Sequence, residues 1–356
     1  MRDGYPMHRW VFEDAYGRYD IDLGDSNVEC GQVGDLAVPG ELVLDYGNAS
    51  GTEALRAAVA ELYGRGVAEV GVTHGAQEAL YLLYRTLLRP SDHVLVLSPG
   101  WRQAVAVPEL IGCRVEVVEH LPTGHPDVGG AVGALRPDTR VIVINTPDNP
   151  TGKRIRPSDV DSLVAAARSV GAFLVLDEEY VVDLGADSLA GRYERAVSVS
   201  SVSKVYGLPG LRVGWLCGPA DVVTNAMDYK HFTSIANSVL AERLATQVLD
   251  RRAEFHARYA RLVTAGRPIL EDWAAAHPDR LRLSQPEGTP FAWVDLRGAG
   301  SSLDFCRAVL DEAKVLLMPA EVFGRENGFR ITFAREPSTL RAGLARVDES
   351  LRAVPA

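Results

Sequence analysis

Near-continuous apolar runs rich in β-branched residues recur through the middle of the chain, between longer segments of mixed polarity. Strands that are buried on both faces have this pattern, because helices cover both sides of a parallel or mixed sheet. We therefore expect an α/β domain with a mostly parallel central sheet between helices. The expected strands lie at residues 93–99, 140–147, 172–180, 196–204 and 212–218.

Helical periodicity and terminator residues place helices at 75–88 and 156–171, the second bounded by Pro157 and Gly171. A long Ala-, Arg- and Leu-rich region from about residue 235 predicts helix that carries the chain out of the large domain. Beyond it, three apolar runs and a final amphipathic segment predict a small α+β domain. We expect an N-terminal segment, 1–35, within the small domain, a large domain over 36–250, and the rest of the small domain over 251–356.

Composition narrows the possible partners. The net charge is −10 and no block of Lys and Arg reverses it locally, so we expect no nucleic-acid partner. The chain shows neither a signal peptide nor an apolar stretch of membrane-spanning length, which predicts a cytoplasmic protein without a membrane partner. The cysteines are scattered, without metal-ligand spacing, which predicts buried free thiols and no metal site. They are Cys30, Cys113, Cys217 and Cys306.

Polar signatures follow the expected strands, at the edge where open α/β sheets bind ligands. Residues 75–77 open a helix, where free N–H groups favour an anion such as phosphate, although an ordinary strand-to-helix turn has the same pattern. Trp101, in "SPGW", either stacks on a planar ring or packs against the protein. Asn149, in "NPTG", stands in a loop that Pro150 makes rigid.

Two further signatures carry charge. Asp177 ends an apolar run and Tyr180 follows it; a buried carboxylate there either caps the local structure or pairs with a bound cation such as a protonated ring nitrogen. Lys204 follows Ser201 at the end of another apolar run, and Arg212 comes eight residues later. A lysine so placed is either solvated or suited to forming a Schiff base with an aldehyde.

The order and spacing of these segments resemble a known family over roughly residues 40–345. "GAQEAL", "SPGW", "NPTG", "DEEY", "SK" with an arginine eight residues on, and "FRITFA" are similar to class I/II aminotransferases. These are enzymes of the aspartate-aminotransferase-like fold (fold type I) that depend on pyridoxal 5′-phosphate (PLP). The resemblance implies a large PLP-binding domain, a small domain and PLP as cofactor.

Roles follow position by position from the resemblance. Lys204 would bind PLP as an internal aldimine and shuttle the substrate proton, and Asp177 would pair with the ring N–H. Asn149 and Tyr180 would hydrogen-bond the ring 3′-oxygen, and Trp101 would stack on the ring.

The remaining roles concern the phosphate, the substrate and a second subunit. Arg330, in "FRITFA", would bind the substrate α-carboxylate, with Asn149 beside it. Tyr46 matches a tyrosine that reaches the neighbouring subunit's phosphate, which implies a homodimer with shared active sites. The groups expected at the phosphate end of the cofactor are Gly75, Ala76, Gln77, Ser201 and Arg212.

Departures from the family pattern leave the reaction open. Ala104 stands where many relatives carry an aromatic residue, and Asp148 replaces the first Asn of "NNPTG". The turn "GLPGLR" and a short N-terminus are similar to a looser branch that includes specialised enzymes of natural-product pathways. The resemblance implies an aminotransferase acting between an α-amino acid and a 2-keto acid. The alternative is a PLP-dependent lyase, cyclase or oxidase of an amino acid such as an arginine derivative.

Overall fold

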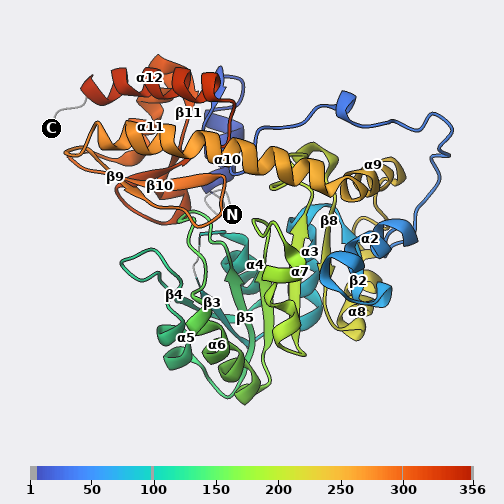
Figure 1. Cartoon of the computed structure of the whole chain (residues 1–356). Helices are drawn as coiled ribbons and strands as arrows, with labels where there is room; N and C mark the ends of the chain where they lie inside the picture. The colour runs from blue at the N-terminus through green and yellow to red at the C-terminus, as the bar shows by residue number, and fades with distance from the viewer. Residues whose placement is uncertain (1–5, 98–99, 299, 354–356) are drawn as a thin grey trace. The chain divides into compact units, whose positions relative to one another are not determined.

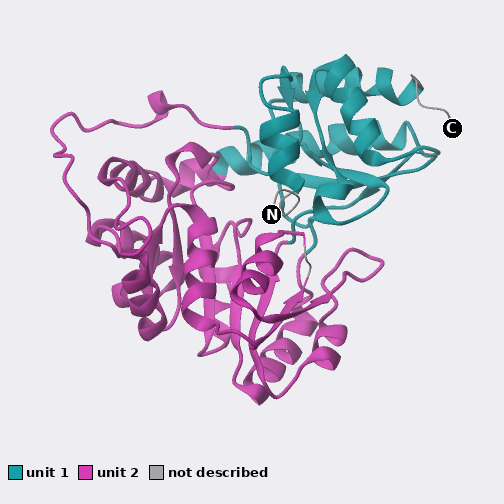
Figure 2. Ribbon diagram, turned by 180° about the vertical axis from the view of Figure 1, so that it is seen from behind, with its two compact units in different colours: residues 1–29, 148–153, 257–356 teal, residues 30–147, 154–256 magenta. Residues whose placement is uncertain are grey.

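The computed structural model describes residues 6–97, 100–298 and 300–353 (Figure 1). The chain divides into two compact units, shown in Figure 2. Unit 1 comprises residues 1–29, 148–153 and 257–356, and unit 2 comprises residues 30–147 and 154–256. The short segment 148–153, which carries the "NPTG" motif, therefore belongs with the two chain ends.

Unit 2 is built on a seven-stranded sheet in the order β2-β8-β7-β6-β5-β3-β4. β3 pairs in parallel with β4 and β5, and the parallel pairing continues through β6 to β7, whereas β8 is antiparallel to β7 and β2. The expected mostly parallel sheet is thereby confirmed. The strands are β2 (Val70–Thr73), β3 (His93–Leu97), β4 (Arg114–Val118), β5 (Thr139–Asn145), β6 (Phe173–Asp177), β7 (Ala196–Ser201) and β8 (Gly214–Cys217).

Helices cover both faces of this sheet. Alternate strand residues such as Val96 and Val143 pack with α3, α4 and α8, while their neighbours Leu97 and Ile144 pack with α5 and α6. The inner strands are therefore buried on both sides, which is why their sequences are largely apolar, whereas the edge strand β4 is partly exposed and carries charged residues. The helices are α2 (Glu53–Tyr63), α3 (Gly75–Leu87), α4 (Gln103–Ile111), α5 (Val128–Ala134), α6 (Pro157–Val170), α7 (Leu184–Asp187), α8 (Ala220–Lys230) and α9 (Val239–Asp250). Short helical turns are η2 (Val33–Asp35), η3 (Val67–Glu69), η4 (Leu189–Arg192) and η5 (Pro209–Leu211).

Unit 1 has an antiparallel sheet in the order β12-β13-β10-β9 and a two-stranded parallel pair, β1-β11. Its core includes Trp10, Trp293 and Phe329. The strands are β1 (Ile21–Asp22), β9 (Leu281–Ser284), β10 (Phe291–Leu296), β11 (Val315–Leu316), β12 (Met318–Pro319) and β13 (Gly328–Thr332). The helices are α1 (Pro6–His8), η1 (Arg9–Asp14), α10 (Arg252–Ala275, beginning in unit 2), α11 (Ser302–Ala308), η6 (Val309–Ala313), η7 (Ala320–Phe323) and α12 (Pro337–Ala353).

Several strand boundaries differ from those expected. β6 ends at Asp177, because the carbonyl of that residue accepts from Asn145 Nδ2 at 3.0 Å and the chain then turns. β8 begins at Gly214, because Arg212 adopts a left-handed φ of 54° at the end of η5. Ser98 and Pro99, expected to end β3, lie outside the described residues. Of the thiols expected to be buried, Cys217 and Cys306 are, whereas Cys30 is exposed and Cys113 half-buried.

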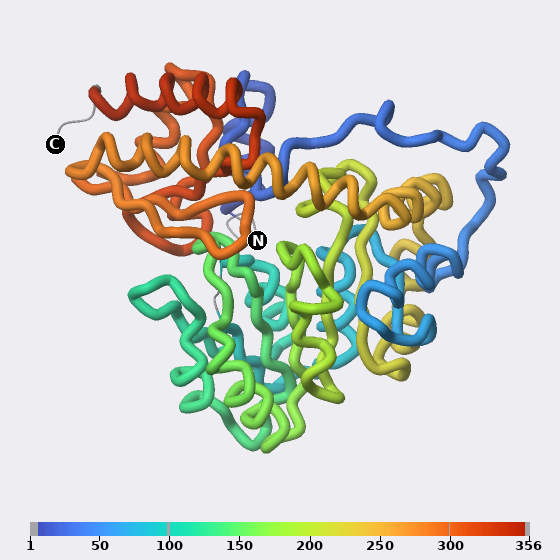
Figure 3. The backbone as a smooth tube through the Cα atoms, viewed as in Figure 1, coloured from blue at the N-terminus to red at the C-terminus, as the bar shows by residue number. Residues whose placement is uncertain are grey.

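Between η2 and α2 the chain has no helix or strand, and Figure 3 shows its backbone as an extended stretch. Its large apolar side chains Val43, Leu44 and Tyr46 are 77%, 75% and 83% exposed. None of the helices in the described part of the chain is long and apolar enough to cross a membrane.

Candidate active site

Asp177 is the acid at the end of β6. Its side chain is buried, and its Oδ1 accepts a hydrogen bond from the Glu179 backbone N–H at 3.3 Å. Burial, followed by the charge of Glu179, raises the pKa of Asp177 from 3.8 to about 8. None of the ion pairs among the described residues involves Asp177. A bound cation would therefore favour its ionised form.

A small pocket adjoins this acid in unit 2. Its walls are largely apolar, with Trp101 on one side and the Asp177 carboxyl as the one acidic group. Such a lining suits a flat aromatic ring that carries a positive nitrogen. The lining residues are Leu80, Tyr84, Val96, Leu97, Trp101, Ala104, Val143, Asn145 and Asp177.

The N-terminus of α3 carries the residues that the sequence predicts at an anion site. Gly75 has a left-handed φ of 73°, which favours glycine, and a Cβ there would lie 2.5 Å from Arg212 Nη2 and would displace that guanidinium. A Cβ on Gly214 would lie 2.6 Å from the Ala76 nitrogen. Arg212 Nη2 donates to the His74 carbonyl at 3.3 Å. The exposed guanidinium of Arg212 thus lies at the N-terminus of the helix, an arrangement suited to an anion such as phosphate.

Gln77 and Trp101 are joined directly. Trp101 Nε1 donates to Gln77 Oε1 at 2.8 Å, and Gln103 Nε2 donates to the Gln77 carbonyl at 2.8 Å. The loop that carries the indole is therefore tied to the first turn of α3, which links the ring pocket to the anion site.

Lys204 follows β7, three residues after Ser201. Its charge acts on both Asp177 and Glu179, so its side chain lies within electrostatic reach of both acids. The chain contains only four lysines. Lys230 is fully buried and hydrogen-bonded, Lys153 is paired with Glu287 at 3.1 Å, and Lys314 ends η6 in unit 1. Tyr180 is buried on the segment after β6.

Glu179 was not assigned a role from the sequence, although it is charged and lies inside the apolar segment "LVLDEEYVV". The structure places it with Ser201, whose Oγ donates to Glu179 Oε2 at 3.0 Å and accepts from the Ser203 N–H at 2.9 Å. The hydroxyl expected to meet a phosphate is thus already engaged with a carboxyl.

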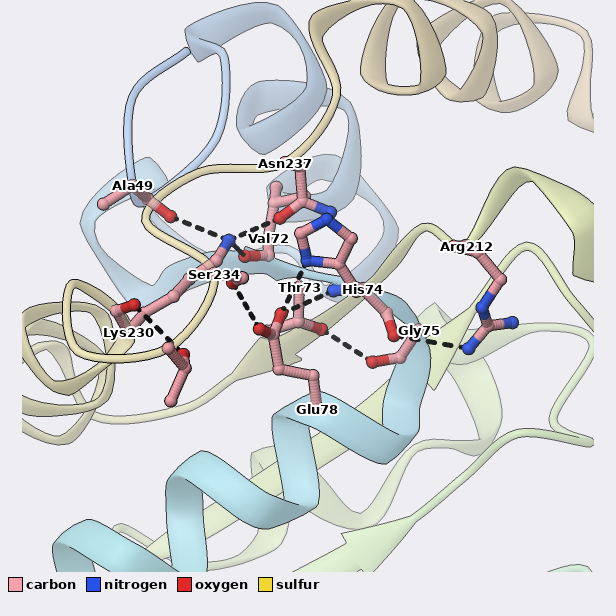
Figure 4. Close-up of polar contacts among 11 residues, drawn as sticks. Ala49, Val72, Thr73, His74, Gly75, Glu78, Arg212, Lys230, Ser234 and Asn237 are labelled. Carbon is pink, nitrogen blue, oxygen red and sulfur yellow. Dashed lines mark hydrogen bonds and ion pairs between the residues drawn. The ribbon is translucent and has the colours of Figure 1, made fainter. Parts of the chain in front are cut away.

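A buried polar cluster behind the anion site was also missed (Figure 4). Lys230 Nζ donates to the carbonyls of Ala49 at 3.1 Å and Val72 at 2.9 Å, and to Asn237 Oδ1. Burial lowers the pKa of Lys230. The lysine thereby joins the segment before α2, strand β2 and the loop after α8. Nothing in the sequence around Lys230, "DYKHF", predicts that this lysine is buried and hydrogen-bonded.

Glu78 completes the cluster on the first turn of α3. Its Oε2 accepts from the His74 N–H at 2.6 Å, and its Oε1 from Ser234 Oγ at 2.5 Å. Burial raises the pKa of Glu78, but hydrogen bonds from His74 and Ser234 outweigh it and hold the pKa at about 2. The charged carboxylate fixes the backbone of His74, the residue whose carbonyl holds Arg212.

In unit 1, the two residues expected on the substrate side are brought together. Arg330, on β13, donates from Nη1 to Asn149 Oδ1 at 2.6 Å and from Nη2 to the Gly24 carbonyl at 2.6 Å. The rings of Phe291 and Phe323 lie 5.3 Å and 5.2 Å from its guanidinium carbon. The guanidinium is therefore buried and fixed in orientation.

The pocket, the buried acid, the anion site and the nearby lysine fit a phosphorylated pyridine aldehyde, and the fold is that of class I/II aminotransferases. A sequence model described as Aminotransferase class I and II matches residues 34–347. The chain belongs to this family, whose members are PLP-dependent enzymes.

The relatives of this chain include different chemistries. Capreomycidine synthase of Streptomyces vinaceus is 31% identical, over 97% of this chain and 93% of that protein. The aspartate aminotransferase of Thermotoga maritima is 27% identical, over 80% and 75%.

Among solved structures, a PLP-dependent aminotransferase from Streptococcus suis aligns with a TM-score of 0.93 and 28% identity, covering 100% of this chain and 99% of that one. The PLP-dependent cyclase OrfR aligns with a TM-score of 0.89 and 29% identity, covering 98% and 96%.

Proposed function

We propose that this protein is a PLP-dependent aminotransferase that moves the amino group of an α-amino acid to a 2-keto acid. The observation that carries the proposal is the grouping of Lys204 with the buried acid Asp177, beside a pocket walled by Trp101. A lysine near a buried carboxyl and an aromatic wall supplies the amine and the ring partner that PLP needs.

Each residue of the proposed site would have a separate role. Lys204 would hold the cofactor and, once released, move a proton from the substrate Cα. Asp177 would keep the proton on the ring nitrogen, because its carboxyl gains a cationic partner there. Bound PLP supplies an electron sink for the carbanion formed at Cα. The phosphate would bind residues 75–77 and Arg212, while Tyr180 and Asn149 would hydrogen-bond the ring oxygen.

Arg330 would bind the α-carboxylate of the substrate. Its guanidinium is preset by Asn149 and Gly24, so little rotamer entropy is lost when a carboxylate binds. Tyr46 is exposed on the extended segment before α2. We propose that it completes the site of a second copy in a homodimer with shared active sites.

A second candidate is cyclisation, elimination or oxidation of an amino acid such as an arginine derivative. The match to capreomycidine synthase over nearly the whole chain and the likeness to a PLP-dependent cyclase support it. The same Cα proton would be removed by Lys204, and the fate of the carbanion would differ.

One experiment separates the two. The PLP-loaded enzyme is mixed with single amino acids without keto acid, and the absorbance of the cofactor is followed. Stoichiometric conversion to pyridoxamine phosphate that stops after one turnover would establish an aminotransferase and its donor. Continuing product release would establish the second candidate. An enzyme that takes up no PLP, or whose cofactor no amino acid alters, would contradict both.

A further inference from the structure

Glu179 is a buried carboxyl with one unsatisfied oxygen. Its side chain is only 8% exposed. Oε2 accepts a hydrogen bond from Ser201 Oγ at 3.0 Å, while Oε1 has no hydrogen-bond partner among the described residues. Buried carboxyl oxygens are nearly always hydrogen-bonded, so Oε1 is an open acceptor position that a water, a ligand or a neighbouring donor can complete.

The groups that act on Glu179 come from several segments. Burial raises the pKa of Glu179 most strongly, and the charges of Lys204 and Arg212 oppose it from the segments after β7 and η5. On its own segment, Glu179 in turn raises the pKa of Asp177. Ser201 and Arg212 are groups expected to hold the cofactor phosphate. Glu179 is therefore a further acid among the groups of the proposed phosphate site.

An ionised Glu179 would be a second anion beside the phosphate. A phosphate carries a charge of about −1.5 to −2 at neutral pH, and two desolvated anions in contact repel one another. A neutral carboxylic acid has an O–H that donates to phosphate, whereas a carboxylate can only accept. The protonated form of Glu179 avoids this repulsion and can donate to an adjacent phosphate, whereas the carboxylate form depends on the charges of Lys204 and Arg212 to offset it.

We propose that Glu179 carries a proton when the phosphate is bound and donates it in a hydrogen bond from its unsatisfied oxygen, so that anion binding at this site takes up a proton. The inference rests on the proposed function, since it assigns the phosphate group of PLP to this site. It adds an acid whose protonation state controls cofactor affinity.

Sulfate tests this on the cofactor-free full chain, because it is a tetrahedral dianion that does not titrate near neutral pH. Its affinity is measured by calorimetry from about pH 6 to about pH 9, in two buffers of different ionisation enthalpy. Above the pKa of Glu179, one required proton weakens binding roughly tenfold per pH unit. In Glu179→Gln, the sulfate affinity should no longer carry this tenfold dependence on pH, and binding should take up about one proton fewer than in the wild type.

Glu194→Gln is the matched control. It removes an exposed carboxylate of unit 2 that is paired with Arg168 at 2.8 Å, and it should keep the wild-type slope. Circular dichroism confirms folding, and Glu179→Ala replaces the glutamine variant if that one does not fold. Equal slopes and equal proton uptake in wild type and the Glu179 variant would overturn the proposal, as would no sulfate binding at pH 6.

Failure of this proposal is distinguishable from failure of the proposed function. Attachment of PLP to Lys204 is read from absorbance, and it would persist in the wild type if Glu179 had no part in phosphate binding. Absence of that absorbance would contradict the proposed function itself.

Discussion

Arg330 and Asn149, 181 residues apart, are hydrogen-bonded at 2.6 Å inside one compact unit. The segment 148–153 that carries Asn149 departs from unit 2, in which its neighbours on both sides lie, and belongs to the compact unit of Arg330. The "NPTG" loop therefore serves to position the arginine, in addition to the role toward the cofactor that the family resemblance implies.

Arg330→Lys is expected to lower kcat/KM by about 100-fold or more, mostly through a higher KM. An ammonium cannot hold Asn149 and Gly24 and also bind a carboxylate through two parallel hydrogen bonds, a loss of about 3 kcal/mol. Steady-state kinetics with the donor amino acid measures the change. Arg346→Lys, at a half-buried residue of α12 paired with Asp20, serves as control and should leave both constants unchanged. An unchanged KM in Arg330→Lys would place carboxylate binding elsewhere.

Lys204→Ala is expected to abolish the cofactor's Schiff-base absorbance and turnover. Borohydride reduction of the PLP-loaded wild type should then fix the cofactor to Lys204 alone, because Lys230 is buried and committed to three acceptors. Peptide mass spectrometry distinguishes the lysines. Lys314→Ala should behave as wild type, and label on any other lysine would refute the assignment.

Asp177→Asn is expected to stabilise the cofactor-free protein as pH rises. The pKa of Asp177 is about 8 in the folded chain against 3.8 ordinarily, so the folded state holds a proton that the unfolded state has lost. Its contribution to stability therefore falls from about pH 4 to about pH 8 and is constant above. At pH 9 the variant should melt about 3 °C or more above wild type, a gap that closes near pH 4. A gap independent of pH would contradict the assigned pKa. With PLP added, the wild type should melt at the higher temperature, because asparagine cannot form an ion pair with a protonated ring nitrogen.

Lys230→Met is expected to destabilise the protein by about 3 kcal/mol. The substitution leaves the carbonyls of Ala49 and Val72 without their donor, and removes the cation that offsets Glu78 and Glu242. Urea denaturation of the cofactor-free protein measures the free energy of unfolding. Lys314→Met should change it by less than about 0.5 kcal/mol. A loss no larger than that of the control would show that the cluster is not structural.

The sequence predicted the parts of this molecule that depend on local pattern. The buried strands were recognisable because both faces are covered, and Asp177 because a carboxylate ends such a strand. Gly75 marked the turn into α3. Each of these signals is contained within about ten residues of chain.

What the sequence did not predict depends on long-range partners. Lys230 lies on a helix of ordinary polarity, and only the fold brings the carbonyls of Ala49 and Val72 to its amine. Glu179 lies in the "DEEY" motif, in which only Asp177 and Tyr180 have roles that the sequence predicts. The bond from Ser201 that marks it comes from the adjacent strand β7.

The proposed homodimer makes a prediction that needs two inactive variants. Lys204→Ala and Tyr46→Ala are mixed under mild denaturation and reassembled at a PLP concentration that leaves Tyr46→Ala alone unloaded. If Tyr46 completes the partner's site, each hybrid has one intact site, and about a quarter of wild-type activity should return. Lys204→Ala with Asp177→Asn is the control, because both residues lie in one unit of one chain and no hybrid restores a complete site. Recovery in the control, or none with Tyr46→Ala, would contradict a site shared through Tyr46.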